Sequence, residues 1–174
     1  MKSSRDSSRR WPPAPHACSA ALAIVALLAC ARARAAADCA LSVTGVAFGN
    51  YDPLATTNAD STGDLTVVCT HVSGGATRVT YTVALSAGDG GTYASRRLRA
   101  GAATLNYNLH DTAARTRIWG DGTAGTVRVS GSLLVNPGVN RVVRASHPIY
   151  GRIPALQAAA TGNYTDTIVV TLAF

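Results

Sequence analysis

The chain has 174 residues, of which 47% are hydrophobic and 14% are charged, and this balance excludes a disordered tail or a highly charged coiled coil. The net charge of +7 is concentrated near the N-terminus, because the chain from Asp38 onward has 10 Arg and 8 Asp, a net of +2, with no Lys and no Glu. The charge therefore gives little support to a nucleic-acid-binding function. Abundant Thr, Val and Gly without Lys or Glu favours strands over helices.

Residues 1–37 have the layout of a secretory signal peptide. Positive charge lies in residues 1–16, and residues 17–31 form an apolar run of fifteen residues, which is short for a membrane span. Ala35 and Ala37 then supply the small residues of a cleavage site, which predicts cleavage between Ala37 and Asp38. The sequence thus predicts an exported protein with a mature chain of residues 38–174.

Three other interpretations of this leader stay open. The apolar run could serve as a permanent N-terminal anchor. A Ser-Arg-Arg motif at residues 8–10 is similar to a twin-arginine signal, although two prolines follow it almost at once. Cys30 follows a Leu-Leu-Ala run that loosely resembles a lipid-attachment box, in which the second leucine fits poorly.

Two cysteines, Cys39 and Cys69, remain after the leader, because Cys18 and Cys30 lie within it. Two cysteines in an exported protein most simply form a disulfide. On the chain-entropy model, closing a loop of about 30 residues stabilises a fold by roughly 3–4 kcal/mol. A metal site is the alternative, but no CxxC or HxxxH motif accompanies the two thiols. The sequence therefore predicts the disulfide and no metal site.

The mature chain reads as short strands separated by turns. Strands are predicted over residues 41–48 with a break at Gly45, 65–70, 79–86, 105–109, 127–135, 149–153 and 165–174. Gly131 lies inside one of these strands and predicts a bulge there. Residues 156–160 are the one segment with a pattern that allows a helical turn. Short strands, frequent turns and one disulfide predict a single β-sandwich domain over residues 38–174.

Catalytic and cofactor-binding patterns are weak. His110 and Asp111 are neighbours in sequence, and neighbouring side chains on a strand point to opposite faces, so they cannot form a base–orienter pair. Two Gly-Asp-Gly turns lack further acidic ligands at calcium-loop spacing. Trp119 and Tyr107 suit core packing better than an exposed carbohydrate platform. We therefore expect no enzyme activity, no cofactor and no metal, and neither a nucleic acid nor a small-molecule substrate as a partner.

Five segments stand out when they are considered together. They are Phe48-Gly-Asn-Tyr-Asp-Pro53, Leu105-Asn-Tyr-Asn-Leu109, Asp111-Thr-Ala-Ala-Arg-Thr-Arg-Ile-Trp-Gly-Asp-Gly122, Pro148-Ile-Tyr-Gly-Arg-Ile-Pro-Ala155 and Gly162-Asn-Tyr-Thr-Asp-Thr-Ile168. In this combination they resemble the spore coat protein U family, the domain of archaic (Csu-type) chaperone–usher pilus subunits. The motif residues expected to have structural roles are Phe48, Gly49, Tyr51, Trp119, Gly120, Asp121, Gly122, Tyr150, Gly151, Pro154, Gly162, Tyr164 and Asp166.

The resemblance implies an all-β, immunoglobulin-like sandwich that lacks its last strand, and therefore an open apolar groove. In chaperone–usher systems a periplasmic chaperone fills this groove during transit to the outer-membrane usher, and the N-terminal extension of a neighbouring pilin subunit then replaces it. The resemblance implies these three partners. One wall of the groove is expected along the last strand, at Ile168, Val170, Leu172 and Phe174. The alternative is a plain core strand that faces a complete sheet.

The stretch ahead of Cys39 departs from that of a polymerising subunit, which needs about ten extended residues with alternating bulky apolar side chains. Cleavage after Ala37 leaves only Asp38 there, and cleavage after Ala31 leaves Arg-Ala-Arg-Ala-Ala-Ala-Asp. Together with this departure, the resemblance implies a structural or adhesive surface subunit that accepts a strand and donates none, at the tip of a pilus or as a minor component. The alternative is a non-polymerising secreted or spore/cell-coat protein that uses the same domain.

Overall fold

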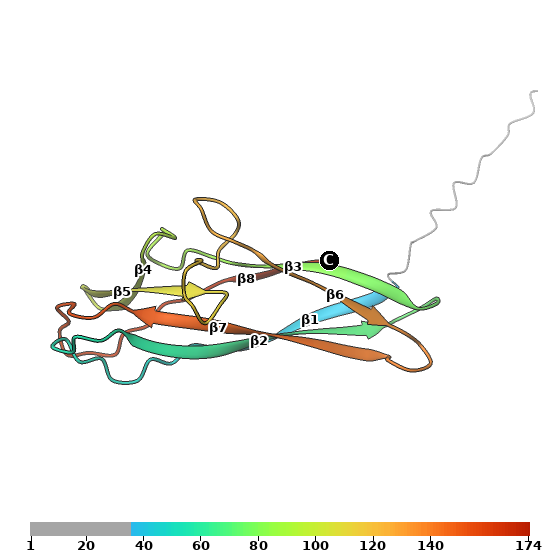
Figure 1. Cartoon of the computed structure of the whole chain (residues 1–174), viewed down its shortest axis with the longest axis horizontal. Coiled ribbons are helices and arrows are strands. Elements are labelled where there is room, and N and C mark those ends of the chain that lie inside the picture. The colour runs from blue at the N-terminus through green and yellow to red at the C-terminus, as the bar shows by residue number, and fades with distance from the viewer. Residues whose placement is uncertain (1–35) are drawn as a thin grey trace, which may run out of the picture. The chain divides into compact units, whose positions relative to one another are not determined.

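The computed structural model of the chain describes residues 36–174, which form strands, turns and bends without a helix. Eight strands follow one another along this part of the chain (Figure 1). They are β1 (Ala37–Thr44), β2 (Ala59–His71), β3 (Thr77–Leu85), β4 (Arg96–Ala100), β5 (Ala103–His110), β6 (Val129–Val135), β7 (Val142–Ile153) and β8 (Val170–Ala173).

The described strands form two sheets that pack face to face. The larger sheet has the order β1-β2-β7-β5-β4 and the smaller one the order β6-β3-β8, and the paired strands run antiparallel. Alternating apolar side chains, such as Val67 of β2, Val83 of β3 and Leu105 of β5, are buried between the sheets. The predicted all-β sandwich is confirmed.

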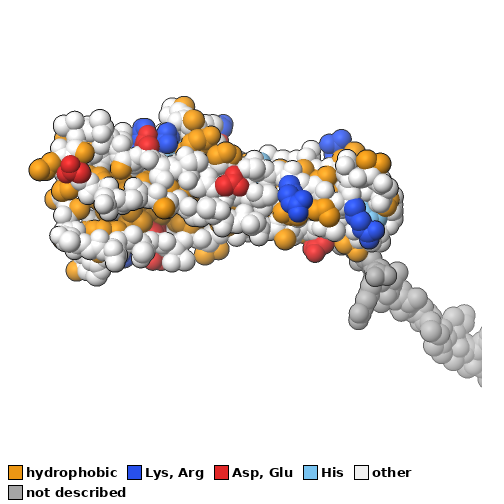
Figure 2. Space-filling model, turned by 90° about the horizontal axis from the view of Figure 1, so that it is seen from below, with side chains coloured by type: hydrophobic (Ala, Val, Ile, Leu, Met, Phe, Trp, Pro, Cys, Tyr) orange, Lys and Arg blue, Asp and Glu red, His pale blue; other side chains and the backbone are white. Residues whose placement is uncertain are grey.

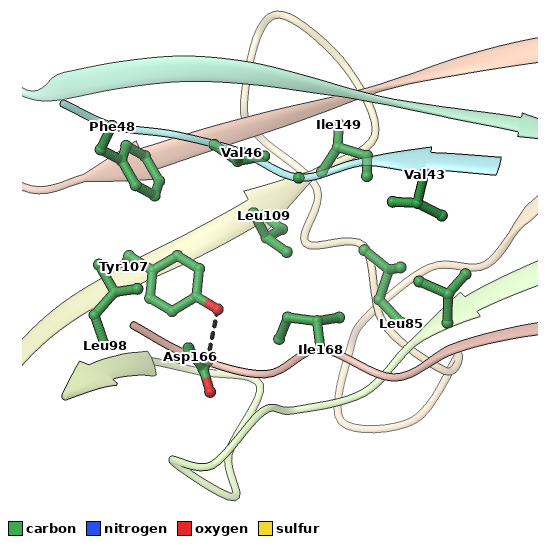
Figure 3. Close-up of a pocket in the computed structure, with 12 residues that line it drawn as sticks. Val43, Val46, Phe48, Leu85, Leu98, Tyr107, Leu109, Ile149, Asp166 and Ile168 are labelled. Carbon is green, nitrogen blue, oxygen red and sulfur yellow. Dashed lines mark hydrogen bonds between the residues drawn. The ribbon is translucent and has the colours of Figure 1, made fainter. Parts of the chain in front are cut away.

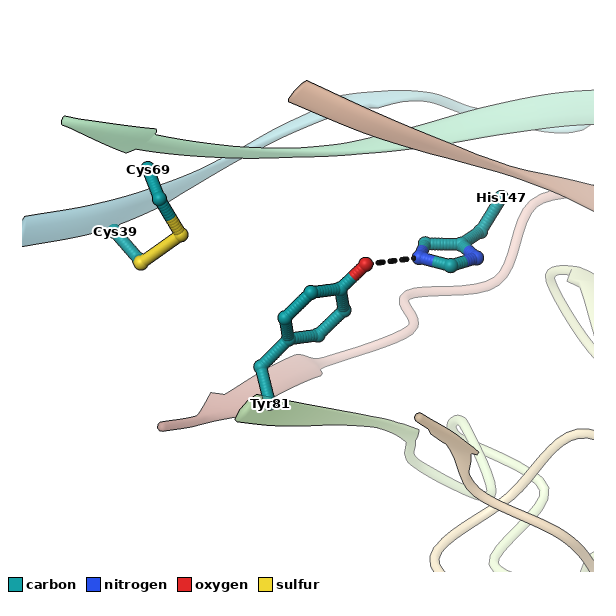
Figure 4. Close-up of a disulfide and its surroundings, with 4 residues drawn as sticks. All are labelled: Cys39, Cys69, Tyr81 and His147. Atoms are coloured by element: carbon teal, nitrogen blue, oxygen red, sulfur yellow. Dashed lines mark hydrogen bonds between the residues drawn. A yellow bond between two sulfur atoms is a disulfide. The ribbon is translucent and has the colours of Figure 1, made fainter. Parts of the chain in front are cut away.

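The region around Cys39 and Cys69, called the disulfide region below, is closed by contacts within the chain (Figure 4). The two cysteines lie opposite each other on β1 and β2 and form the predicted disulfide. Tyr81 of β3 reaches His147 of β7 across the two sheets, with the hydroxyl 2.8 Å from Nε2 and the rings edge to face. A covalent bond and a polar contact thus hold strands that are distant in sequence.

The last strand is shorter than the predicted span of residues 165–174. Thr165 pairs instead with Arg99 through two backbone hydrogen bonds, beside β4 of the other sheet. Ser86 then donates its backbone N–H to the carbonyl of Val169 at 2.9 Å, and β8 proper begins at Val170. The segment therefore passes from one sheet to the other, which period-2 alternation does not reveal.

Three further expectations about local structure are corrected. Gly131 lies in an uninterrupted ladder opposite Tyr81, where a Cβ would collide with the tyrosine ring, so the glycine serves a close approach and the predicted bulge is wrong. Residues 156–160 form bends and coil rather than a helical turn, and Leu156 has a positive φ of 57°. Strand β4 was not predicted, since three of its five residues are arginines.

The predicted leader lies almost entirely in residues 1–35, outside the described part of the chain. Of the predicted cleavage site, Ala37 is buried at the start of β1, and Asp38 lies opposite Thr70 of β2. The domain boundaries 1–37 and 38–174 stay predictions. Within residues 36–174 there is no helix of the length and apolar character that a membrane span requires.

Candidate functional site

An apolar groove lies between two segments that are distant in sequence (Figure 3). Its first wall, residues 43–48, includes the end of β1 and carries Val43, Val46 and Phe48. Its second wall, residues 166–170, leads into β8 and carries Ile168 and Val170. Between these walls is a cavity of about 220 Å³.

The floor of the groove belongs to the hydrophobic core. Leu85 at the end of β3, Leu109 of β5 and Ile149 of β7 line the cavity, and all three are buried. The ring of Tyr107, also from β5, packs edge to face against Phe48, with the centroids 5.9 Å apart. The groove therefore opens onto the interior of the sandwich, where an apolar side chain entering from outside would be buried.

A second cavity of about 660 Å³ continues the groove toward the loops. Its sides are formed by residues 46–53 and 159–166, which extend the first and second walls. The residues common to the two cavities are Val46, Phe48, Leu98 and Asp166. On the face shown in Figure 2, hydrophobic side chains come to the surface between a small number of charged side chains. The two cavities together are called the groove below.

The backbone beside the groove has free edges. Among the described strands β8 pairs only with β3, and it lies at the margin of the smaller sheet. β1 lies at a margin of the larger sheet, and residues 45–50 that follow it belong to no strand. A further strand between the two walls can pair its backbone with β8 while alternate side chains enter the cavities. The groove has the geometry of a β-strand binding site.

The structure brings two of the four predicted wall residues to the cavity. Ile168 and Val170 line it, as described above. Leu172 lies opposite Val83 in the ladder between β3 and β8 and packs against the core. Phe174 follows the end of β8 and is 59% exposed.

The motif residues fall into two groups. Those that line the groove are Phe48, Gly49, Tyr51, Gly162, Tyr164 and Asp166. Those that lie elsewhere are Trp119, Gly120, Asp121 and Gly122 in a turn, Tyr150 and Gly151 in β7, and Pro154 just after it. Trp119 is fully buried and its Nε1 donates to the carbonyl of Val83 at 3.1 Å, which confirms its predicted role in core packing.

Arg96 fixes the second wall, and sequence reasoning missed it. Its buried guanidinium donates to the carbonyls of Ser86 (3.0 and 2.8 Å) and Trp119 (2.7 Å) and to Oδ1 of Asn108 (2.7 Å). Ser86 in turn accepts a hydrogen bond at Oγ from the backbone N–H of Val169 at 2.9 Å. Burial lowers the pKa of Arg96, and carbonyl oxygens rather than a carboxylate satisfy its donors. An arginine in an Arg-Arg-Leu-Arg run gives no sign of burial in the sequence.

Asp166 is the one charged residue among those that line the groove. Its carboxylate accepts hydrogen bonds from the Tyr107 hydroxyl (2.6 Å) and from the backbone N–H groups of Asp89 and Thr167 (2.8 Å each) (Figure 3). Burial, together with this hydrogen bond, raises the pKa of Tyr107 far above its usual value, so the phenol stays protonated and donates. These bonds anchor the second wall to β5 and to the loop after β3.

Side chains able to bind a metal ion are dispersed within residues 36–174. That part of the chain has no cluster of three or more His, Cys, Asp or Glu side chains able to hold a metal ion. His110 Nδ1 lies 3.2 Å from the carbonyl of Tyr150, and Asp111 pairs with Arg117, so the two neighbours have separate partners. Burial lowers the pKa of His110. The geometry described here supports binding of an extended chain.

The fold and the site together define a class of protein, an all-β sandwich with an apolar groove along a free strand edge. The family model of the Spore Coat Protein U domain matches residues 25–171, so the chain belongs to the spore coat protein U domain family. Protein U of Myxococcus xanthus is 32% identical over 134 residues, which are 73% of this chain and 70% of that protein. The match to the family model confirms the resemblance noted in the sequence.

A solved structure is similar to the chain in fold. It is the pre-assembly complex of the chaperone CsuC with the tip adhesion subunit CsuE, from archaic chaperone–usher Csu pili of Acinetobacter baumannii. The TM-score is 0.53 and the identity 21%, and the match covers 79% of this chain and 40% of that chain. At this identity the likeness shows the fold, an immunoglobulin-like β-sandwich.

Proposed function

We propose that the chain is an exported structural subunit of a chaperone–usher pilus, and that its groove accepts a β-strand from a partner. The observation that carries the proposal is the groove itself, which runs along the free edge of β8 and opens onto core residues such as Leu109 and Ile149. A strand placed there completes the sandwich and removes an aggregation-prone edge. Family membership and the fold shared with a subunit of archaic pili support this assignment.

Three partners follow from the proposal. A periplasmic chaperone lends a strand to the groove in transit, an outer-membrane usher receives the complex, and a neighbouring subunit then supplies the strand in the fibre. The protein passes through the periplasm to the cell surface, and its role is structural rather than enzymatic. The likeness to a subunit captured with its chaperone supports the first of these partners.

We also propose a terminal or minor position in the fibre. Strand exchange is head-to-tail, so a shaft subunit needs both a groove and an extension that fills the next groove. Residues 32–38, Arg-Ala-Arg-Ala-Ala-Ala-Asp, contain no bulky apolar side chain to fill a cavity of about 220 Å³. A subunit of this kind accepts a neighbour's strand and ends the series.

Periplasmic expression with and without a pilus chaperone tests the main proposal. Alone, the chain should aggregate or be degraded, and with the chaperone it should form a soluble one-to-one complex. Ile168→Asp, which places a charge in the cavity, should abolish the complex, whereas Val169→Asp on the exposed side of the same segment should preserve it. A stable, well-behaved monomer without any partner would contradict the proposal.

Release from the chaperone tests the terminal position. Electron microscopy of the chain alone should show no fibres longer than a dimer, because no strand is available to propagate the series. Addition of a peptide copied from a shaft subunit's extension should raise the stability of the chain, by about 2.7 kcal/mol at a hundredfold excess over Kd. Long fibres formed by the chain alone would refute a terminal position.

A second candidate function is a non-polymerising secreted or coat protein. The description of the family and the similarity to Protein U favour it. This alternative predicts a chain that is stable at the cell surface without a chaperone, with the groove closed by a segment of its own or by a second copy. The same expression experiment therefore separates the two candidates.

A further inference from the structure

The groove is lined by one charged residue, which lies where its two cavities meet. Asp166 lies there, partly exposed, and lines both cavities. Leu98 from β4 and Ile168 from its own wall lie beside it, and Val46 and Phe48 of the first wall lie across the cavity (Figure 3). A carboxylate that is covered at such a place is costly to bury unless the group that covers it supplies a hydrogen bond or a positive charge.

The acceptor capacity of the Asp166 carboxylate is nearly filled by the chain. Oδ1 accepts from the backbone N–H groups of Asp89 and Thr167, while Oδ2 accepts from the Tyr107 hydroxyl. A carboxylate offers about four acceptor sites, which leaves one on Oδ2. Gly88, at a φ of 70°, lies so close that a Cβ there would collide with the carboxylate, so the group is confined on that side. The carboxylate is therefore held in place and keeps one acceptor site that no residue of the described range 36–174 fills.

The alternation of the second wall fixes which residue of an incoming strand faces Asp166. Asp166, Ile168 and Val170 are partly buried, while Thr167 and Val169 between them are exposed. A strand paired beside this wall has its inward side chains in step with those three residues, whether it runs parallel or antiparallel. On the incoming strand, one inward-pointing side chain faces Ile168 and fills the cavity. The next inward-pointing side chain of that strand faces Asp166.

We propose that Asp166 selects the partner strand by requiring a hydrogen-bond donor or a positive charge at the inward position next to the residue that faces Ile168, and by rejecting an acidic side chain there. This inference rests on the proposed strand-accepting function and adds the chemistry of the partner. The strand excludes water from Asp166, so a lysine or threonine that reaches Oδ2 replaces the lost hydration. A glutamate places two carboxylates together in a site with little water, which is strongly unfavourable.

A strand fused to the full chain tests the proposal. The chain is extended after Phe174 by a Gly/Ser linker and a strand of about nine alternating Val and Thr residues, with one inward position as the guest. Lys, Thr, Val and Glu are compared at the guest position by urea unfolding, in the wild-type chain and in Asp166→Asn. The same Lys and Glu exchange at an outward position of the strand serves as the matched control.

The quantity compared is the ratio of the folding equilibrium constant with the Lys guest to that with the Glu guest. In the wild-type chain this ratio should be at least about tenfold. In Asp166→Asn the ratio should fall to about threefold or less, and at the outward position it should stay near one. Tyr107→Phe removes a donor from Oδ2, so the ratio there should exceed the wild-type value. Equal stabilisation by all guests would overturn the inference and leave the strand-accepting function intact. A strand that stabilises no variant would overturn the proposed function itself.

Discussion

The disulfide region and the groove are built from the same two sheets, but they differ in burial. Other parts of the chain cover the side chains of the disulfide region, whereas the side chains beside the groove stay partly exposed. Around the disulfide, Leu65, Val67 and Cys69 are fully buried by other parts of the chain, and Tyr81 meets His147 between the sheets. Beside the groove, Val43 is 47% exposed, Ile168 and Val170 are only partly buried, and β8 has a free edge among the described strands.

The difference shows that a sandwich can have a complete region and an incomplete one. Burying a Val, Leu or Ile side chain fully gives about 1.5–3 kcal/mol, so the few apolar residues around the groove represent several kcal/mol that residues 36–174 do not recover by themselves. Leaving them exposed creates an aggregation hazard and, at the same time, a driving force for binding a strand. Substitutions in the two regions should therefore respond differently to a partner.

Loss of the disulfide should have the largest effect and should not depend on a partner strand. Replacing both Cys39 and Cys69 with Ser should lower the free energy of unfolding by roughly 3–4 kcal/mol, because the unfolded chain regains the entropy of an open loop. Urea unfolding measures this loss in two proteins. One is the fused-strand chain, and the other is a matched fusion, called the Gly/Ser fusion, in which a Gly/Ser segment replaces the strand. A loss that appears only when the strand is present would contradict the separation of the two regions.

Truncation of the groove wall should have a smaller effect that depends on the strand. Ile168→Ala should cost about 2 kcal/mol in the fused-strand chain, where the side chain is covered, and clearly less in the Gly/Ser fusion. Val67→Ala, in the closed core, is the matched control and should cost the same in both fusions. Equal costs of Ile168→Ala in the two fusions would show that the groove is not the place where the strand binds.

The smallest expected effect is a pH dependence from the disulfide region. Burial lowers the pKa of His147, against a weaker opposing effect of Asp64, so the unfolded chain binds more protons than the folded one below the ordinary histidine pKa of about 6.5. This contribution to stability should be intact above that pH and should decline as the pH falls toward about 5. His147→Gln, which keeps an acceptor for the Tyr81 hydroxyl, should reduce the decline.

The decline should not vanish in that variant, because burial also lowers the pKa of His110. Urea unfolding of the fused-strand chain at about pH 7.5 and pH 5.5 measures the slope for the wild-type chain and for His147→Gln. An identical slope in the two would show that His147 does not contribute.

The sequence was sufficient for the fold class and for the covalent link. Alternation in residues 79–86 and the pairing of Cys39 with Cys69 depend on local pattern and on simple counting, and the structure confirms both. The family resemblance, carried by short motifs, is confirmed by the match over residues 25–171. These features need no knowledge of contacts between distant segments.

The groove was only partly predictable, because its two walls are distant in sequence and come together only when the chain folds. Alternation along the last segment pointed to Ile168 and Val170, but it could not show that Phe174 lies beyond the strand. Nor could it show that Asp166 reaches Tyr107, or that Arg96 is buried beneath the wall. Charged and polar residues in a strand-like pattern carry no local signal of a buried partner.

Hydrogen exchange along the chain tests the central claim most directly. In the Gly/Ser fusion, the amides of residues 166–173 that point to the free edge should exchange quickly, because few contacts protect that edge, whereas amides of residues 65–69 should be protected. With the fused strand, exchange of those edge amides should slow by about a hundredfold or more, with little change at residues 65–69. Protection at residues 166–173 that is already high without a strand, and is unchanged by one, would contradict the account of an open groove that a partner completes.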